Sequence, residues 1–423
     1  MPRLSSLRLI TALLGLLLSA CATPPSLTLM STPVIYQGAA IDPFAHLTDD
    51  ERIPDVALFY ATNRQPEAGH YGNGVSNQLH LGQSVVRLGD PQSQWPQLRS
   101  ASLSATRSHE LPLNLVQTKE ASSVALAPVV QSPLSKTTQA YVDAINLELE
   151  KARDKEIIIY VHGAKVDFAN ANELTGELVH FAGRDFVGLA FSWPSHQNIF
   201  SYLLGIDVQR ARQSSQALCQ LIELLARHTA AERINLVAYS AGGRVASLAL
   251  QRIAERHPGL SREQLQARYR LGAMIFAAAD VPEELFEERL PAISQLTEQV
   301  MITVSDQDDA LNYARHLMPG GPRIGTTQAE GKLRQFAQQQ SLENIMFLDV
   351  SSRHQVSGVT IAGHHYWYRH PWVSSDVILL MRTNLAPAQR ALTMGDHPAI
   401  WFMQPDYPEA VRSATRKVLR GQW

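Results

Sequence analysis

Ser240 has the surroundings in this chain that most clearly indicate chemistry. The apolar run from Ile234 to Ala238 precedes it, and Gly242 and a helical pattern follow at once. A serine on so sharp a strand-to-helix turn is typical of a nucleophile elbow. The turn requires small residues two positions before and after the serine, and Ala238 and Gly242 meet that requirement. A serine that only caps the helix is the simpler alternative. The sequence therefore predicts a serine nucleophile.

A serine nucleophile needs a base to take its proton and a carboxylate to orient that base. On a strand-turn-helix scaffold these partners follow the serine in the order acid, then histidine. Three carboxylates follow an apolar strand at residues 305–311, and a fourth follows the strand before it. The acid candidates are therefore Asp306, Asp308, Asp309 and Asp280. The base candidates are His354, His364, His365, His370 and His397, and the loop Gly363-His364-His365-Tyr366 is the most plausible place for one.

Strand and helix patterns alternate through the region that contains these residues. The expected strands lie at about 157–161, 187–191, 234–238, 273–278, 299–304 and 345–350. The expected helices lie at about 138–151, 172–181, 208–228, 243–256, 282–290, 310–317 and 375–382. Continuous apolar strands joined by helices predict an α/β protein with a mostly parallel central sheet and helices on both faces. Two earlier strands are expected at 56–60 and 84–88.

The strand at 157–161 ends in His162-Gly163-Ala164, a turn that can offer a backbone donor to the reaction. Glycine lets the chain turn sharply, so that the N–H of Ala164 can face a substrate carbonyl. The N–H of Ala241, at the head of the helix after the serine, is its expected partner. We expect His162 to hold this loop by a hydrogen bond rather than to act in catalysis.

Six short segments occur together in this chain. They are Tyr60-Ala61-Thr62-Asn63-Arg64, Val161-His162-Gly163, Phe191-Ser192-Trp193-Pro194-Ser195, Tyr239-Ser240-Ala241-Gly242, residues 305–311 and Gly363-His364-His365-Tyr366. Together they resemble a bacterial α/β-hydrolase family catalogued as domain of unknown function 900, over about residues 34–385. The family's Ser-x-x-Asp-x-Ala-Leu segment implies Asp308 as the acid, and its Gly-His-x-Tyr segment implies His364 as the base. The chain departs from the family at Tyr239, where His is usual, and at Ala164, where Tyr is usual. Both departures lie beside the reaction centre and bear on substrate preference.

The residues and the resemblance together predict an α/β-hydrolase fold and a serine hydrolase. Ser240 would attack an ester carbonyl, His364 would carry the proton, and Asp308 would orient the base. The N–H groups of Ala164 and Ala241 would hold the oxyanion. Water would then release the acyl group, which makes a carboxylic-ester hydrolase acting on a small-molecule or lipid ester. Acyl transfer on the same triad, or a non-catalytic envelope lipoprotein that retains the fold, are the alternatives. The sequence contains neither a His-Glu-x-x-His motif nor a Gly-rich phosphate loop, so we expect no metal and no other cofactor.

The first twenty residues predict a secretory signal rather than part of the fold. Arg3 and Arg8 precede an apolar stretch at 9–18, which is too short to span a bilayer. The stretch ends in Leu17-Leu18-Ser19-Ala20-Cys21, which resembles a bacterial lipobox and implies acylation of Cys21. Because Ala22 and not Asp follows the cysteine, the resemblance implies an anchor in the outer membrane, facing the periplasm of a Gram-negative bacterium.

The expected organisation has four parts. They are a signal peptide at 1–20, a lipidated cysteine and tether at 21–50, a hydrolase domain at 51–385 with a poorly patterned surface excursion at 89–135, and a C-terminal extension at 386–423. The 423 residues carry 37 basic and 39 acidic side chains, a net charge of -2, which argues against a nucleic-acid partner. Two cysteines are too few for a disulfide scaffold. The sequence does not indicate an oligomeric state.

Overall fold

The computed structural model describes residues 27–38, 41–126, 133–354 and 359–418. The expected signal peptide at 1–20 and the candidate lipidation residue Cys21 lie outside these ranges. Within the described ranges, no helix combines the length and the apolar character that crossing a bilayer requires.

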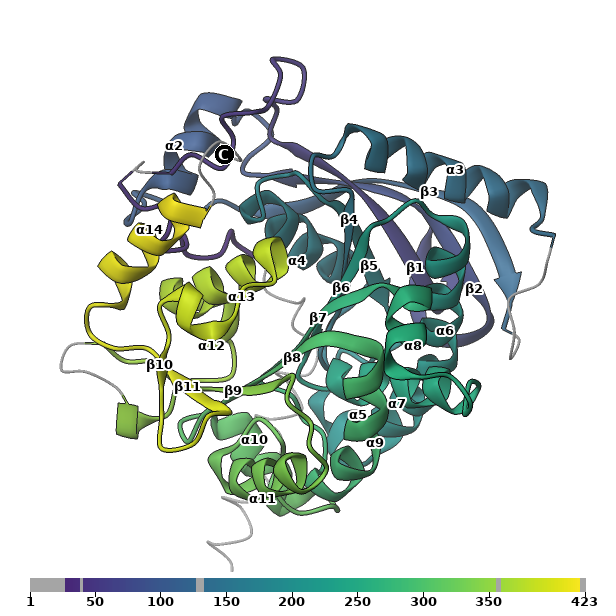
Figure 1. Ribbon diagram of the computed structural model, residues 1–423. Helices are drawn as coiled ribbons and strands as arrows, with labels where there is room; N and C mark the ends of the chain where they lie inside the picture. The colour runs from purple at the N-terminus through teal and green to yellow at the C-terminus, as the bar shows by residue number, and fades with distance from the viewer. Residues whose placement is uncertain (1–26, 39–40, 127–132, 355–358, 419–423) are drawn as a thin grey trace, which may run out of the picture.

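The described residues form one eleven-stranded sheet that runs through the middle of the molecule (Figure 1). The strands are β1 Asp55–Glu67, β2 His70–Leu88, β3 Leu113–Ala125, β4 Glu156–Val161, β5 Val187–Ser192, β6 Arg233–Tyr239, β7 Leu271–Ala277, β8 Thr297–Val304, β9 Ile345–Asp349, β10 Thr393–Met394 and β11 Ile400–Phe402. Their order is β10-β11-β9-β8-β7-β6-β4-β5-β1-β2-β3. In this spatial order, every pair of neighbours from β11 to β1 is parallel. The pairs β1–β2, β2–β3 and β10–β11, at the two ends of the sheet, are antiparallel. The expected mostly parallel sheet is confirmed.

Helices cover both faces of the sheet, as expected. One face carries α3 Lys136–Lys151, α6 Ile206–His228, α7 Gly242–Glu255, α8 Arg262–Tyr269, α9 Glu283–Leu296 and α11 Thr327–Gln339. The other carries α2 Trp95–Leu103, α4 Phe168–Phe181, α12 Tyr366–Arg369, α13 Pro371–Thr383 and α14 Tyr407–Val418. Figure 1 shows these two groups on opposite sides of the strands. The short helices α5 Ile199–Leu203 and α10 Asp309–Leu317 follow strands β5 and β8.

Strand β4 shows why the central sheet was visible in the sequence. Ile157, Ile159 and Val161 pack into the core on one face, while Ile158 and Tyr160 pack into the core on the other. Side chains alternate between the faces of a strand, so a strand buried on both sides is apolar throughout. The strands and helices expected between residues 138 and 382 are all present, with ends shifted by a few residues. The strands expected at 56–60 and 84–88 are parts of the longer β1 and β2.

The expected tether at 21–50 is wrong for its described part, because residues 27–38 and 41–50 belong to the packed domain. Buried apolar side chains in this part are Leu29, Met30, Val34, Ile35, Tyr36, Ile41, Phe44 and Leu47. The backbone N–H of Leu29 donates to the carbonyl of Leu111 (2.8 Å), and the hydroxyl of Tyr36 donates to the carbonyl of Phe181 (2.7 Å). Because these partners lie far apart in the chain, the local pattern of the sequence does not predict that this segment is packed.

Two further expectations about the domain's outer parts are corrected. The supposed surface excursion at 89–135 contains helix α2 and the edge strand β3. The supposed C-terminal extension at 386–423 contributes β10 and β11 to the same sheet, and α14 packs into the same core as α13. These elements are short or exposed on one side, which weakens their apolar pattern.

Candidate active site

Ser240 occupies a strained turn between β6 and α7. Its φ of 50° lies in the left-handed region, where a non-glycine residue is uncommon, and 7% of its surface is exposed. A Cβ on Gly242 would lie 2.4 Å from the carbonyl oxygen of Val161, so no larger residue fits there without movement of the backbone. The turn is held by two backbone bonds: the N–H of Ser240 donates to Ala277 (3.0 Å), and that of Asp280 donates to the Ser240 carbonyl (3.0 Å). Strand, turn and helix thus form an elbow that presents the hydroxyl.

The loop before α12 and the loop after β8 bring a histidine and a carboxylate to this hydroxyl. Nε2 of His364 lies 2.7 Å from Oγ of Ser240. On the other side of the ring, Nδ1 lies 2.8 Å and 3.0 Å from the two carboxylate oxygens of Asp308. Asp308 is fully buried and caps α10, where it accepts the N–H of Leu311 at 3.1 Å. The structure therefore brings together three of the residues singled out in the sequence.

The other acid candidates have different surroundings. Asp280 is buried in an ion network, 2.5 Å from Nε of Arg323 and 3.4 Å from Nη2 of Arg244. Asp306 accepts the backbone N–H of Ser352 at 2.7 Å. Asp309 is an exposed residue in the first turn of α10. Each of these carboxylates has a structural explanation that does not involve His364.

The other histidine candidates whose side chains the structure describes do not reach Ser240. His370 caps α13, where it accepts the N–H of Trp372 (3.4 Å), and His397 lies 3.4 Å from Gln338. The side chain of His354 lies outside the described residues. Nδ1 of His365 lies 2.6 Å from the hydroxyl of Tyr239. His365 is therefore bound to the neighbour of the nucleophile and not to the nucleophile itself.

Tyr239 is a site residue whose contacts the sequence did not reveal. Besides its contact with His365, its hydroxyl donates to the carbonyl oxygen of His364 at 3.3 Å. Its ring lies 5.1 Å from that of His364, and burial raises its pKa well above the usual value, so the hydroxyl stays neutral. Its place beside Ser240 and its departure from the family's usual histidine were the signals available from the sequence.

The loop at residues 162–166, here called the oxyanion loop, passes directly against the elbow. A Cβ on Gly163 would lie 3.1 Å from Cβ of Ser240. Among the described residues, no hydrogen-bond acceptor is found for the backbone N–H of Ala164 or of Ala241. Ala241 directly precedes α7, so its N–H lies at the positive end of the helix dipole. Neither candidate donor is therefore occupied by an acceptor within the described part of the protein.

His162 is bound on every side within this loop. Its Nδ1 lies 2.7 Å from the carbonyl oxygen of Gly163, and its Nε2 accepts the N–H of Trp193 at 3.1 Å. The indole of Trp193 donates to the carbonyl of His162 (2.7 Å) and stacks on its ring at 5.3 Å. Burial holds the pKa of His162 well below its usual range. These are the contacts of a residue that shapes the loop.

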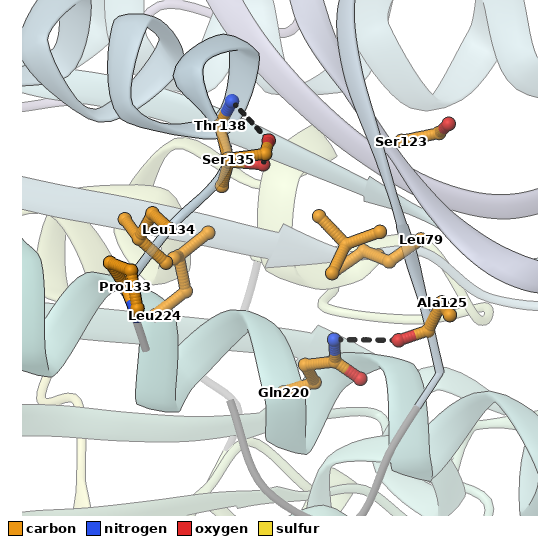
Figure 2. A pocket seen from close by; sticks show the side chains of 10 residues that line it. Leu79, Ser123, Ala125, Pro133, Leu134, Ser135, Thr138, Gln220 and Leu224 are labelled. Atoms are coloured by element: carbon orange, nitrogen blue, oxygen red, sulfur yellow. Dashed lines mark hydrogen bonds between the residues drawn. The ribbon is translucent and has the colours of Figure 1, made fainter. Parts of the chain in front are cut away.

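A pocket of about 150 Å³ lies elsewhere, where β3 approaches α3 and α6 (Figure 2). Figure 2 shows the amide of Gln220 reaching the carbonyl of Ala125 (3.1 Å) and the hydroxyl of Ser135 accepting the N–H of Thr138 (3.2 Å). None of the residues around Ser240 lines this pocket. It is therefore separate from the candidate site.

Neither the remaining thiol nor a metal centre adds to the site. Cys219 is buried in α6, and burial raises its pKa to about 12, so it is not a nucleophile at neutral pH. Within the described ranges, no group of three or more His, Cys, Asp or Glu side chains is placed to hold a metal ion.

The parallel sheet and the strand-serine-helix elbow define an α/β hydrolase. The sequence model of a family described as "Alpha/beta hydrolase of unknown function (DUF900)" matches residues 137–382, which is more than half of the chain. The chain belongs to this α/β-hydrolase family of unknown function, so the family resemblance found in the sequence is confirmed.

Several solved structures are similar to this chain at low identity. An uncharacterized protein from Bacillus cereus ATCC 10987 is 15% identical with a TM-score of 0.33, and the match covers 64% of this chain and 61% of that protein. The chain thus spans about three fifths of that protein's length. A dienelactone hydrolase from Anabaena variabilis ATCC 29413 is 15% identical with a TM-score of 0.28, over 54% of this chain and 83% of that one. Esterase B from Lactobacillus rhamnosis, in a complex with a tributyrin phosphonate, is 14% identical with a TM-score of 0.34, over 53% and 73%. No curated protein matches the chain.

Proposed function

We propose that this protein is a serine hydrolase that cleaves carboxylic esters through an acyl-enzyme intermediate. The observation that carries the proposal is the hydrogen-bonded series from Ser240 through His364 to Asp308, with contacts of 2.7 Å and 2.8 Å. A base within this distance of a hydroxyl can take its proton as the hydroxyl attacks. The strained backbone of Ser240 supports the proposal, because such strain is concentrated at functional sites.

In the acylation step, Nε2 of His364 takes the proton of Ser240 while Oγ forms a bond to the ester carbonyl. Asp308 holds the proton of His364 on Nδ1, and its buried charge stabilises the imidazolium that forms. The carbonyl oxygen becomes an oxyanion and is held by the N–H groups of Ala164 and Ala241. His364 then gives its proton to the leaving alcohol, and the oxyanion collapses to the acyl-enzyme.

Deacylation repeats these steps with water. His364 takes a proton from the water, whose oxygen attacks the acyl carbon, and the same two N–H groups hold the second oxyanion. The proton returns to Oγ of Ser240 as the carboxylic acid leaves. An alcohol in place of water would give acyl transfer with the same residues, and the products distinguish the two outcomes.

We propose further that acylation of Cys21 anchors the protein to the membrane. Leu27 is the sixth residue after Cys21 and its carbonyl already accepts the N–H of Leu113 at 2.8 Å. Six residues span at most about 20 Å, so the hydrolase domain would be held close to the lipid surface. A Cys21→Ser variant should then lose lipid attachment and normal maturation, a chain that starts at Ala22 should appear in the soluble fraction, and the mature N-terminal peptide of the parent should carry the mass of the acyl groups. An unmodified Cys21 in a membrane-bound parent would refute this anchor.

The decisive test of the chemistry compares Ser240→Ala with Ser247→Ala. Ser247 is a buried serine on α7, about two turns beyond Ser240, so its variant is a matched control for loss of a hydroxyl. Nitrophenyl esters of increasing acyl length measure turnover, and a fluorophosphonate probe labels an activated serine. We expect Ser240→Ala to lose both turnover and labelling and Ser247→Ala to keep both. Parent-like turnover in Ser240→Ala would sink the assignment, and a parent that neither turns over nor is labelled would favour the non-catalytic alternative.

A further inference from the structure

Arg64, the last residue of the Thr-Asn-Arg motif in β1, is a buried cation without an ionic partner. Only 1% of its surface is exposed, and no carboxylate of the described residues forms an ion pair with it. Burial lowers its pKa to about 9, so it is still charged at neutral pH. Asp167 and Asp207 stabilise the charge only from beyond ion-pair distance, and a buried charge without a close partner costs stability. The presence of Arg64 therefore needs an explanation other than a contribution to the stability of the fold.

The guanidinium of Arg64 connects three segments around the elbow. Its Nε donates to Oγ of Ser192 at the end of β5 (2.8 Å), and its Nη1 donates to the carbonyl of Gly72 in β2 (3.2 Å). Its Nη2 donates to the carbonyl of Val166 (2.7 Å) and lies 3.4 Å from Nε2 of His162. Two of these four contacts are with the oxyanion loop.

The contact with His162 has a consequence for the direction of a backbone N–H. The carbonyl of Gly163 can only accept, so Nδ1 of His162, 2.7 Å away, carries the ring proton and Nε2 is the acceptor. The backbone N–H of Trp193 donates to Nε2 at 3.1 Å, and Arg64, which can only donate, lies 3.4 Å from the same nitrogen, so both contacts support this tautomer. In a trans peptide, the carbonyl of one residue and the N–H of the next point in opposite directions. When His162 fixes the carbonyl of Gly163, it also fixes the direction of the N–H of Ala164.

We propose that Arg64 is a positioning residue that holds the oxyanion loop in its active shape, through the carbonyl of Val166 and through the ring of His162. The inference rests on the proposed function, because the direction of the Ala164 N–H matters only if an oxyanion forms there. Arg64 itself does not touch the reacting atoms. It acts by keeping a donor preorganised, which is the property on which oxyanion stabilisation depends.

The test replaces Arg64 with Met, which keeps the length of the side chain and removes its donors and charge. The matched control is Arg87→Met on the same hairpin. Arg87 also makes four side-chain hydrogen bonds, to Asp55, Asp90, Pro91 and Ser93, at the end of β2. Both variants should melt at a lower temperature than the parent, so kcat and KM are measured well below either melting temperature.

We expect Arg64→Met to lower kcat by about 10²-fold, the lower end of the loss caused by removal of one oxyanion donor, with KM changed less than about threefold. Affinity for a trifluoromethyl ketone, whose adduct with a serine is an oxyanion, should fall by a similar factor. Arg64→Lys keeps the charge but cannot span Ser192, Val166 and His162, so its kcat should stay low. Arg87→Met should keep the parent's kcat.

A double variant separates action through the loop from a general weakening of the fold. His162→Asn alone should lower kcat, and Arg64→Met added to it should lower kcat by less than it does alone, because both changes act on the same peptide group. Losses that multiply, or an Arg64→Met variant with the parent's kcat, would overturn the inference while leaving the serine hydrolase intact. A parent that no fluorophosphonate labels would overturn the proposed function, and this inference with it.

Discussion

Replacing Asp308 with Asn removes a charge from the candidate site and keeps its shape. In the parent, Oδ1 of Asp308 accepts the N–H of Leu311 (3.1 Å) and lies 3.0 Å from Nδ1 of His364, while Oδ2 lies 2.8 Å from the same nitrogen. If the amide oxygen takes the place of Oδ1, the helix cap is kept and the NH2 group faces His364. The ring must then carry its proton on Nε2, where it cannot accept the proton of Ser240. If the amide is turned over, the useful tautomer survives and the cap is lost.

The two parts of this effect differ in size. A lost N-cap costs about 1 kcal/mol, so the preference for the wrong tautomer is roughly fivefold. The cap contributes only this factor, since the Asp→Asn change in a Ser-His-Asp triad as a whole lowers kcat by about 10⁴, or roughly 5 kcal/mol of barrier, through the wrong tautomer together with the loss of the charge beside the imidazolium. We expect Asp308→Asn to lose about 10³- to 10⁴-fold in kcat and to change the free energy of unfolding by less than about 1 kcal/mol.

Asp280→Asn is the matched comparison, because Asp280 is the rival acid and is also fully buried. Removing its charge leaves Arg244 and Arg323 without their partner, which costs about 3–5 kcal/mol of stability. Its backbone N–H still donates to the carbonyl of Ser240, so the elbow is kept. Turnover of nitrophenyl esters and urea unfolding are measured for both variants. A stable Asp280→Asn protein without activity, beside an active Asp308→Asn protein, would refute the assignment of the acid.

Three further outcomes follow from packing and burial. Gly242→Ala should lower stability by about 1–3 kcal/mol and abolish ester turnover, because its Cβ would lie 2.4 Å from the Val161 carbonyl; thermal unfolding and kcat check this, and an active, stable variant would contradict it. Burial raises the pKa of Glu177 from 4.5 to about 8. The folded state is therefore most stable below about pH 4.5, where the carboxyl is neutral in both states, and it loses stability as the pH rises to about 8. Glu177→Gln keeps an acceptor for the N–H of Met30 and should gain stability over the parent with rising pH, by roughly 3 kcal/mol at pH 7; a pH-independent difference in unfolding free energy would count against it. Deleting residues 1–50 removes eight buried apolar side chains, each contributing about 1.5–3 kcal/mol, and should abolish cooperative unfolding, which a urea titration checks.

The interior of the sheet and the nucleophile could be predicted from the sequence because their signals are local. A strand buried on both faces is a continuous apolar run. Ser240 directly follows such a run and stands just before a helix. The acid and the base have no such local signal. Asp308 and His364 meet across 56 positions of the chain, and only the family resemblance separated them from Asp306 and His365. In the structure the separation has a physical cause: Asp306 is bound to the backbone of Ser352, and His365 to the hydroxyl of Tyr239.

The outer parts of the domain could not be predicted, because their stability comes from partners distant in the chain. Five consecutive residues of strand β3, at 116–120, are exposed and four of them are polar, and the hydrogen bonds of the strand to β2 cannot be recognised from composition. Residues 22–50 are rich in Thr, Pro and Ser, yet the apolar side chains of the described part at 27–38 and 41–50 pack beside α4 and α13. The sequence showed Arg64 only as part of a motif, because its hydrogen-bond partners in the oxyanion loop lie about a hundred positions away in the chain.

Tyr239, where the chain departs from its family, contacts the loop that carries the base. Its side chain is buried, and its hydroxyl contacts the carbonyl of His364 and the ring of His365. These contacts connect that loop to the residue beside the nucleophile. Ala164 is different, because it is only partly buried and its N–H faces no acceptor among the described residues. By the resemblance to the family, Ala164 is the departure that bears on substrate preference, because its side chain is smaller than the tyrosine that is usual there.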